Sequence, residues 1–524
     1  MGTVGENLVK GLKARGVEVV FGIPGAHTIQ LYRGLADSGV RHVTARHEAG
    51  AVFMADGYAR VSGKPGVAFI ITGPGLTNAL TAMGQAKADS VPMLVISGVN
   101  RRDSLGLGMG HLHELPDQAG MIRTLCPSFQ VTAPEALEPV LDLAFAALNS
   151  GRPGPVHIEI PTDVMPLPCE DLGVPQPKPP AMVGNSHTLA RAADLLNAAR
   201  RPVILVGGGI RHGAREVRAL AEKLDAPVVQ TMNARGLMWG HPLSVAASPS
   251  LPAARALINA ADAVLALGTE LGQTEYDMYD TGSFIDLSTM IRVDICALQL
   301  ARRPAHLKIL GDACATADAL LPMVTGKSAD GAARASGVMD RSFEELAALA
   351  PEFPMARRMI EAMRDALPGA LVVGDSTSPV YAGNLAYDHD RAGGWFNSGV
   401  GFGSLGYAPG AAVGAALAAP GAPVICLIGD GGLQFSPGEL RTAVDEKLPI
   451  TFVIWNSASY AEIAKYMIEA RTEVIGCHPS PLKMEPFAAA CDLPFRSVPL
   501  DPAALGAVIA EKSVGPRMIE VRLF

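Results

Sequence analysis

The stretch "IGDGGLQFSPGEL", residues 428–440, places an aspartate between glycines directly after the apolar run of residues 422–427. The next apolar run, "PITFVIWNS", residues 449–457, ends on Asn456 and Ser457. A carboxylate beside a glycine-rich turn, with amide or hydroxyl oxygens at a neighbouring strand end, can hold a divalent cation against a phosphate. The alternative is a tight strand-to-helix turn in which the aspartate only caps the helix. The rest of the chain has to decide between the two.

The composition of the chain bounds its class. With 524 residues it exceeds the roughly 250–300 residues that one hydrophobic core serves, so we expect about three domains. Hydrophobic residues make up 49% of the chain and charged residues 18%, which is enough apolar material for large cores. The net charge of −8 and the lack of a basic cluster argue against a nucleic-acid or membrane partner.

Targeting and redox signals indicate a cytoplasmic protein. No apolar stretch reaches the ~20 residues of a membrane-spanning helix. The N-terminal sequence "MGTVGENLVKGLKARG" lacks the apolar core of a signal peptide. The seven cysteines are scattered and form no CxxC pair, so we expect buried free thiols in a reducing compartment.

Short apolar runs alternate with helical patterns along the chain, which predicts parallel sheets covered by helices on both faces. The runs include "VEVVFGIPG", "GVAFIITGPG", "PMLVISGV", "PVHIEIP", "RPVILVGGGI", "APVVQT", "DAVLALGTEL", "IRVDIC", "GALVVGDST", "APVICLIGDGG", "ITFVIWNS" and "PRMIEVRLF".

Two segments divide these runs into three blocks. Residues 166–184 are rich in proline, and residues 325–337, "TGKSADGAARASG", are polar and small. We therefore predict an α/β chain of three doubly wound parallel-sheet domains, over residues 1–165, 185–325 and 350–524. Such sheets bind ligands at the carboxyl ends of their strands, which is where the glycine-rich turns lie.

The order of the motifs is more specific than any one of them. "FGIPGAHT", "RHEAGAVFMADGYAR" and "ITGPGLTNAL" follow one another in the first block, and "NSGVGFGSLGYAPGAAVGAAL" and "GDGGLQFSPGEL" lie in the third. In these stretches, and over essentially its whole length, the sequence resembles the thiamine-diphosphate-dependent enzymes of the acetolactate synthase and 2-oxo-acid decarboxylase superfamily. The resemblance implies a pyrimidine-binding first domain, a central spacer domain, and a third domain that binds diphosphate and Mg2+. It also implies a homodimer or homotetramer, because sites in this family lie between subunits.

Glu48 in "RHEAG" matches the glutamate that activates the cofactor in this family. A carboxyl group bonded to the pyrimidine nitrogen favours the imino tautomer, whose exocyclic nitrogen can then remove the thiazolium carbon proton. This task requires an apolar pocket that favours the protonated carboxyl group, and "AGAVFMA" supplies apolar neighbours. The resemblance places Gly25 and Asn78 in the same cofactor site. The alternative is that Glu48 is an exposed helix residue.

Asp430 matches the metal-binding aspartate of the family, and Gly431 and Gly432 would offer backbone N–H groups to diphosphate oxygens. The family pattern continues to a pair of asparagines, of which the second binds the metal.

The sequence departs from that pattern, because Ser457 stands in the second place, after Asn456. Three alternatives follow: Ser457 binds the metal directly, it binds through water, or Asn456 shifts to replace it. By resemblance, Ser459 supplies a backbone carbonyl ligand.

Leu405 in "GSLGY" falls where the family places the bulky residue that bends the cofactor, and Ser404 beside it belongs to the same site. An ordinary core leucine is the alternative, and the two roles are compatible. Ser376 and Thr377 lie at a strand end before a helix and are expected to donate hydroxyl hydrogen bonds to the diphosphate.

Two histidines are candidates for substrate chemistry. His27 follows the first strand, where a benzaldehyde-lyase-like member also carries histidine, and His113 falls near the position of a glutamine in acetolactate synthases. Histidine titrates near neutral pH, so it can move a proton to or from the substrate hydroxyl. A structural role is the alternative for each. His111 is the weaker candidate, since alternation in an extended segment would point it away.

Acetolactate synthases of the biosynthetic type bind FAD in their central domain. Here "VGGGI", residues 206–210, could approach a phosphate, but a lone glycine cluster is a weak signal. Residues 272–282, "GQTEYDMYDTG", lack the arginine of the flavin-binding segment. We therefore expect no FAD.

Within the superfamily, "FGIPGAHTIQLYRGL", "HLHELPDQ" and "GDSTSPVYAGN" are similar to decarboxylases of 5-guanidino-2-oxopentanoate. The resemblance implies decarboxylation of a 2-oxo acid to an aldehyde and CO2. A carboligase or lyase of the acetolactate synthase type is the first alternative, because it shares every cofactor residue. An inactive regulatory homologue is the second, and Ser457 keeps it open.

A guanidinium tail would need a carboxylate that accepts paired N–H bonds. The candidates are Glu462 in "SYAEIAKYM", on the helix expected after the metal loop, and Glu114 and Asp117 beside His113. Glu462 is preferred, because that helix lines the substrate channel in the family. The alternative is that these carboxylates are solvated helix charges or caps.

Overall fold

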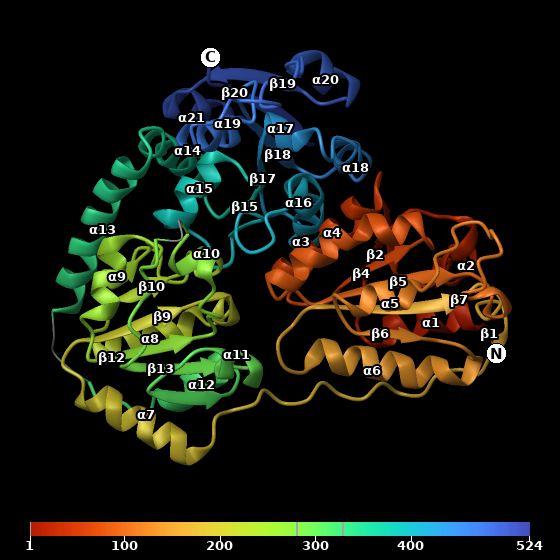
Figure 1. Cartoon of the computed structure of the whole chain (residues 1–524), viewed down its shortest axis with the longest axis horizontal. Helices are drawn as coiled ribbons and strands as arrows, with labels where there is room; N and C mark the ends of the chain where they lie inside the picture. Colours follow the sequence, from red (N-terminus) through yellow and green to blue (C-terminus); the bar gives the residue numbers. More distant parts are fainter. Residues whose placement is uncertain (1, 279–280, 327–329) are drawn as a thin grey trace.

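We describe the protein from a computed structural model of the chain, which describes residues 2–278, 281–326 and 330–524. It contains three six-stranded sheets in which all neighbouring strands are parallel. Each sheet lies between helices, as Figure 1 shows for the three colour blocks. The predicted architecture of three doubly wound α/β domains is confirmed.

The first sheet has the order β3-β2-β4-β5-β7-β6. Its strands are β2 (Val19–Gly22), β3 (Arg41–Thr44), β4 (Gly66–Ile70), β5 (Met93–Val99), β6 (Ser128–Gln130) and β7 (Pro155–Pro161). The helices of this domain are α1 (Val4–Ala14), α2 (Ile29–Leu35), α3 (Glu48–Ser62), α4 (Pro74–Ala88), α5 (Gln118–Arg123) and α6 (Leu137–Asn149).

The central sheet has the order β11-β10-β9-β12-β13-β14. Its strands are β9 (Pro202–Val206), β10 (Val228–Gln230), β11 (Ser244–Val245), β12 (Ala263–Leu267), β13 (Met290–Asp294) and β14 (Leu307–Leu310). The helices are α7 (Ser186–Ala198), α8 (Ala214–Leu224), α9 (Pro252–Asn259), α10 (Gln273–Tyr276), α11 (Ala297–Arg302) and α12 (Ala313–Leu320).

The third sheet has the order β16-β15-β17-β18-β20-β19. Its strands are β15 (Leu371–Gly374), β16 (Trp395–Asn397), β17 (Val424–Gly429), β18 (Ile450–Asn456), β19 (Phe495–Pro499) and β20 (Arg517–Arg522). The helices that follow the central domain are α13 (Gly331–Leu349), α14 (Phe353–Ala366), α15 (Ser378–Leu385), α16 (Tyr407–Ala418), α17 (Asp430–Leu433), α18 (Glu439–Asp445), α19 (Ala461–Glu469), α20 (Met484–Ala490) and α21 (Pro502–Ala510).

The two predicted linkers differ in structure. The proline-rich segment first pairs β8 (Pro168–Cys169) with β1 (Gly2–Thr3) and then runs without helix or strand to α7, along the lower edge of Figure 1. In the second linker, residues 327–329 lie outside the described residues, and the chain is helical from Gly331. The domain bounds drawn from these linkers stay predictions.

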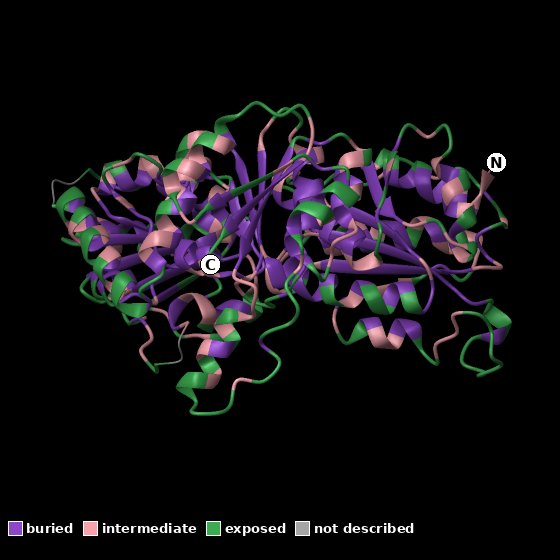
Figure 2. Cartoon of the chain, turned by 90° about the horizontal axis from the view of Figure 1, so that it is seen from above, coloured by how far each residue is buried: buried purple, intermediate pink, exposed green. Residues whose placement is uncertain are grey.

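Helices α3 and α16 join the first domain to the third. Both are rich in glycine and alanine, so their backbones approach closely: a Cβ atom added at Gly57 would lie 2.0 Å from the Ala411 carbonyl oxygen, and one added at Gly414 would lie 1.9 Å from that of Met54. One hydrophobic core continues from the first domain across these helices into the third. Figure 2 shows the strands buried between more exposed outer helices.

Local signals explain where α3 begins and ends. His47 caps its start by accepting a hydrogen bond from the Ala49 N–H, and Gly63 ends it in the left-handed conformation, with φ of 71°. Among the described residues, no helix is both long and apolar enough to cross a membrane.

Candidate active site

The first group of predicted site residues lies at the carboxyl edge of the first sheet. Glu48 is the first residue of α3, and its Oε2 accepts a hydrogen bond of 3.0 Å from Asn78 Nδ2 on α4. A Cβ atom at Gly75 would lie 3.3 Å from the Glu48 side chain and 2.5 Å from Ile71. Ile71 also lies against Gly25, where an added Cβ would be 2.4 Å away. The structure therefore brings Gly25, Glu48 and Asn78 together.

The two candidate histidines form a pair. The rings of His27 and His113 meet edge to face, with centroids 5.3 Å apart. Burial and the nearby His113 lower the pKa of His27, and its Nδ1 is buried without a hydrogen-bond partner among the described residues. His113 has φ of 61°, a strained conformation for a residue with a side chain. His111 is exposed and lies outside the pair.

Glu114 and Asp117 are engaged in the loop and helix that follow. Glu114 accepts hydrogen bonds from the backbone N–H groups of residues 109, 110 and 111, at 3.2, 2.7 and 2.9 Å. These bonds lower its pKa. Asp117 caps α5 by accepting from the Gly120 N–H at 2.7 Å. Asp117 thus has the capping role that was an alternative to binding a guanidinium group, and Glu114 accepts hydrogen bonds from its own loop.

Gln118 organises the same edge and was not singled out from the sequence, although it ends the quoted stretch "HLHELPDQ". It is buried, accepts from the Gly73 N–H at 3.0 Å, and donates to the Gly98 carbonyl at 2.9 Å. Gly73 lies against the His113 backbone and Gly98 against that of His27, and neither has room for a Cβ. No local signal marks a buried glutamine, so only the structure identifies it.

The second group lies at the carboxyl edge of the third sheet. Asp430 follows β17 directly as the first residue of α17, and it is buried. Burial raises its pKa, while hydrogen bonds from Ser457 oppose this shift. Gly431 lies against Tyr460, where an added Cβ would be 2.6 Å from the ring, and Gly432 lies against Asp375. The aspartate is thus held at a strand end, followed by two buried glycines at the start of α17.

Ser457 contacts both Asp430 and Ser459, whereas among the described residues the Asn456 side chain bonds to neither. The Ser457 N–H donates to Asp430 Oδ1 at 3.1 Å, and its hydroxyl lies 3.4 Å from the same oxygen. That hydroxyl donates to the Ser459 carbonyl at 2.9 Å. The Asn456 side chain is buried, donates to Glu520 at 2.6 Å and accepts from the Ala458 N–H. The shift of Asn456 into the missing position therefore finds no support in this geometry.

The donor atoms around Asp430 suit a hard cation. A carboxylate, a hydroxyl and a carbonyl oxygen lie together, and Mg2+ is bound in proteins through few carboxylates while phosphate and water oxygens complete its shell. Among the described residues, no three side chains of His, Cys, Asp or Glu gather as an all-protein metal cage. The oxygen group therefore fits a cation that a diphosphate shares.

The remaining predicted cofactor residues line the loops of the third domain. Ser376 and Thr377 lie between β15 and α15, with the Ser376 hydroxyl 3.5 Å from that of Ser398. The Ser404 hydroxyl is buried without a hydrogen-bond partner among the described residues, so it is available to bond to a ligand. Leu405 is 36% exposed, so its side chain is free to contact a bound molecule.

Glu462 lies in the first turn of α19 and is half-buried. Burial raises its pKa, and the neighbouring carboxylates Glu352 and Glu469 act in the same direction. Lys465, the nearest opposing charge, instead pairs with Glu352 at 3.8 Å. Among the described residues Glu462 forms no ion pair, so its carboxylate is available to a cationic ligand.

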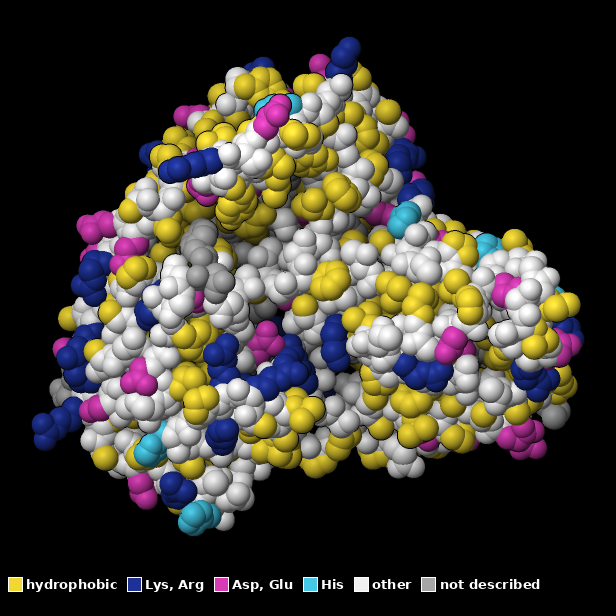
Figure 3. Space-filling view, viewed as in Figure 1, with side chains coloured by type: hydrophobic (Ala, Val, Ile, Leu, Met, Phe, Trp, Pro, Cys, Tyr) yellow, Lys and Arg dark blue, Asp and Glu magenta, His cyan; other side chains and the backbone are white. Residues whose placement is uncertain are grey.

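A separate cavity of about 310 Å³ lies at the carboxyl ends of the central strands. It is lined by Gly207–Gly209 and Gly268, and by Asp89, Arg152 and Gly401 from the other two domains. Figure 3 shows the surface hollowed where the three domains meet. The expectation that no FAD binds stays a prediction.

Three family models match the chain in the order of its domains. The N-terminal TPP binding domain of thiamine pyrophosphate enzymes matches residues 2–121, the central domain residues 189–320, and the C-terminal TPP binding domain residues 375–521.

Individual relatives agree with these models. The chain is 42% identical over 485 residues to the probable 2-ketoarginine decarboxylase of Pseudomonas aeruginosa, covering 91% of this chain and 86% of the relative. It is 30% identical over 541 residues to acetolactate synthase isozyme 1 large subunit of Escherichia coli, covering 99% and 94%. It is 32% identical over 489 residues to acetolactate synthase of Mycobacterium bovis, covering 88% and 77%.

These matches confirm the predicted family and its cofactor, thiamine diphosphate, with Mg2+ as the usual metal partner. The chain belongs to the thiamine-pyrophosphate-dependent enzymes, in the group that contains 2-oxo-acid decarboxylases and acetolactate synthases.

Proposed function

We propose that the protein decarboxylates 5-guanidino-2-oxopentanoate (2-ketoarginine) to the corresponding aldehyde and CO2. The observation that carries this proposal is the 42% identity to a probable 2-ketoarginine decarboxylase, against 30% and 32% to acetolactate synthases of comparable coverage. Glu462 supports it, because an unpaired, half-buried carboxylate on the helix after the metal loop suits a guanidinium tail.

Thiamine diphosphate, when bound, would supply a nucleophilic carbon, the deprotonated thiazolium carbon, and a cationic ring that serves as the sink for the electron pair released with CO2. Asp430 and the Ser459 carbonyl would hold Mg2+, with the Ser457 hydroxyl as a further oxygen donor. Ser376 and Thr377 would donate hydrogen bonds to the diphosphate.

At the pyrimidine edge, Glu48 would bind the ring nitrogen, and Asn78 holds its carboxylate in place at 3.0 Å. His27 and His113 would move a proton at the substrate hydroxyl. Burial lowers the pKa of His27, which favours the neutral imidazole that can accept a proton.

We also propose that the active form is a homodimer or homotetramer. Glu48 lies at the start of α3 in the first domain and Asp430 follows β17 in the third, and among the described residues no hydrogen bond joins these two side chains to each other. A complete site then needs the pyrimidine domain of one subunit and the diphosphate domain of another. The free state of all seven cysteines supports a cytoplasmic location.

Product analysis with a panel of 2-oxo acids tests the reaction. The proposal expects CO2 and an aldehyde in equal amounts from the guanidino acid. An acetohydroxy acid from pyruvate as the main product would instead assign the enzyme to the carboligases.

The Glu462→Gln variant tests the tail contact. A hydrogen bond to a charged group contributes about 1.5–3 kcal/mol, so KM for the guanidino acid should rise roughly tenfold to hundredfold while pyruvate is unaffected. Glu485→Gln, an exposed carboxylate in the first turn of α20, is the matched control and should change neither. Equal losses on both substrates would place Glu462 in the chemistry, and no turnover of the guanidino acid by the unmodified enzyme would refute the substrate assignment.

A further inference from the structure

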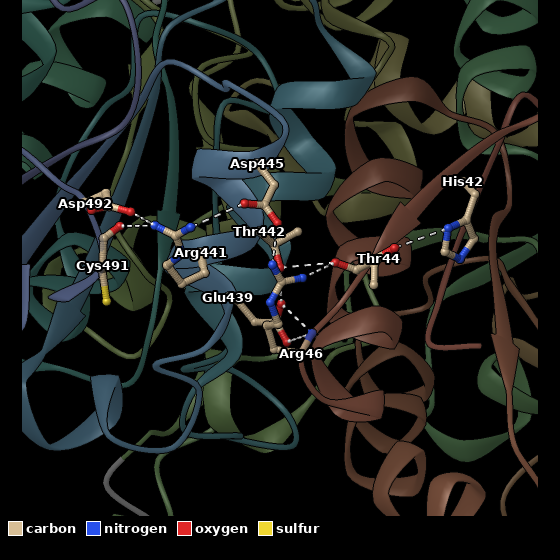
Figure 4. Close-up of polar contacts among 9 residues, drawn as sticks. All are labelled: His42, Thr44, Arg46, Glu439, Arg441, Thr442, Asp445, Cys491 and Asp492. Atoms are coloured by element: carbon tan, nitrogen blue, oxygen red, sulfur yellow. Dashed lines mark hydrogen bonds and ion pairs between the residues drawn. The ribbon is translucent and has the colours of Figure 1, made fainter. Parts of the chain in front are cut away.

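Glu439 is a buried carboxylate that joins the third domain to the start of α3. It is the first residue of α18 and is 1% exposed. Its Oε1 accepts hydrogen bonds from the backbone N–H groups of Arg46 and His47, both at 3.1 Å. Its Oε2 lies 3.3 Å from the Arg46 nitrogen and accepts from the Thr442 hydroxyl at 2.8 Å. Figure 4 shows the side chain reaching from α18 to the first domain.

The two amides that Glu439 binds directly precede Glu48. Amides at a helix start lack partners within the helix, and a carboxylate there is stabilised by the helix dipole as well as by the hydrogen bonds. Gly50 makes the approach possible, because a Cβ atom at that position would lie 2.0 Å from Glu439 Oε1. The carboxylate therefore sits within the first turn of the helix that begins with the activating glutamate.

Flanking contacts fix the same backbone from the side. The Arg46 guanidinium pairs with Asp445 on α18 and donates to the Thr44 carbonyl at 3.0 Å. Asp445 also lies 3.6 Å from Arg441. These groups are partly exposed, so they add less than the buried carboxylate does.

We propose that Glu439 is a positioning residue for Glu48: by accepting the Arg46 and His47 N–H groups, it fixes the start of α3 and hence the place of the Glu48 carboxyl group. The inference rests on the activating role of Glu48 in the proposed function. By this inference the third domain, which carries the metal motif, also fixes the start of α3 in the first domain of the same chain.

Two alanine substitutions test this from opposite sides. Glu439→Ala removes the acceptor, whereas Gly50→Ala keeps the carboxylate but displaces it from the helix start. Glu439→Gln retains an acceptor oxygen for the two amides and turns its amide group toward the Thr442 hydroxyl, which can accept. Glu446→Gln is the matched control, because Glu446 pairs with Arg41 across the same two domains without touching α3.

The first measurement is amide hydrogen exchange in the protein without cofactor. Exchange of the Arg46 and His47 amides should rise at least about tenfold in Glu439→Ala and Gly50→Ala, because their hydrogen-bond acceptor is lost. It should stay within about threefold of the unmodified protein in Glu439→Gln and Glu446→Gln.

The second measurement is deuterium exchange at the thiazolium carbon in the loaded protein, with Glu48→Gln as reference. Both alanine variants should slow it at least about tenfold while cofactor affinity changes less than about threefold, and Glu439→Gln should restore it.

Unchanged amide exchange in both alanine variants overturns the inference. Thiazolium exchange that is equally slow in Glu439→Gln and Glu439→Ala also overturns it, because the charge of Glu439 rather than its hydrogen-bond acceptor would then matter. Slow thiazolium exchange in Glu48→Gln with normal exchange in both alanine variants also overturns it, while the proposed function stands. Normal thiazolium exchange in Glu48→Gln overturns the role of Glu48 itself. If Glu439→Ala does not fold, Gly50→Ala decides.

Discussion

The Gly414→Ala substitution should destabilise the protein through the contact between α3 and α16. The added Cβ atom would lie 1.9 Å from the Met54 carbonyl oxygen and 2.8 Å from the Tyr58 nitrogen, both backbone atoms of α3. Ordinary van der Waals contact begins at 3.4 Å, so the helices would have to separate by about 1.5 Å.

The loss of stability can be estimated from the cost of overpacking this helix contact. Overpacking a core costs about 1–3 kcal/mol and occasionally more, and here rigid backbone meets the new atom instead of a flexible side chain. Gly57 makes the reciprocal contact with Ala411, so the helices cannot relieve the clash by a local shift. Alanine gains about 0.8–1 kcal/mol over glycine in a helix, which offsets only part of the loss. With the overpacking cost at the upper end of its range, about 3 kcal/mol, and the helix gain subtracted, we expect a net loss of about 2 kcal/mol.

Urea unfolding monitored by circular dichroism measures this loss. Gly337→Ala in α13 is the matched control: the same exchange in a helix, where the added Cβ meets only the Arg341 guanidinium at 3.7 Å. It should raise the free energy of unfolding by about 0.5–1 kcal/mol, and the urea midpoint should rise slightly with it. If Gly414→Ala is as stable as Gly337→Ala, then the two helices do not pack backbone to backbone and the reasoning is wrong.

The other predictions concern the site. Glu48→Gln should slow deuterium exchange at the thiazolium carbon by about two orders of magnitude or more with cofactor binding nearly intact, because a neutral amide cannot drive the tautomerisation; an unchanged rate would contradict its role. Ser457→Asn should tighten Mg2+ binding about fivefold in calorimetric titration, as an amide oxygen is the stronger ligand, whereas weaker binding would mean that the site has been rebuilt around serine. Because burial raises the pKa of Glu462 above its usual 4.5, KM for the guanidino acid should rise as pH falls toward that raised value and the carboxylate is neutralised. A KM for pyruvate that follows the same pH profile would exclude this explanation.

The strands found from the sequence and those that were missed differ in one physical respect. Each predicted run became an interior strand, such as β4, β9 and β17, buried on both faces and therefore continuously apolar. Within the three six-stranded sheets, each strand that went unpredicted lies at the edge of its sheet: β3, β6, β11, β14, β16 and β19. Edge strands are short and mixed in character, as "SFQ" and "LKIL" are, so their sequences carry no distinct apolar signal.

Part of the site could also be predicted from the sequence. Asp430 and Ser457 each follow the end of an apolar run, and parallel pairing of β17 with β18 in register, Gly429 opposite Trp455, brings the two ends together. In the same way, Gly25, Glu48 and Asn78 lie close together because all three lie at the carboxyl edge of the first sheet. The roles assigned to these residues stay predictions.

Other features depend on the tertiary structure alone. The sequence left open whether Asn456 could replace the missing ligand, and the structure commits its side chain to Glu520 on β20. The sequence around Gln118 and Glu439 gives no sign of their contacts. Gln118 bonds to the two glycines that lie beside His27 and His113, and Glu439 bonds to the start of α3. The apolar pattern records which face of each element is buried, because burial is a property of single positions. Which polar groups meet is set by how helices pack across domains, and the bond between His47 and Glu439 joins residues 392 positions apart.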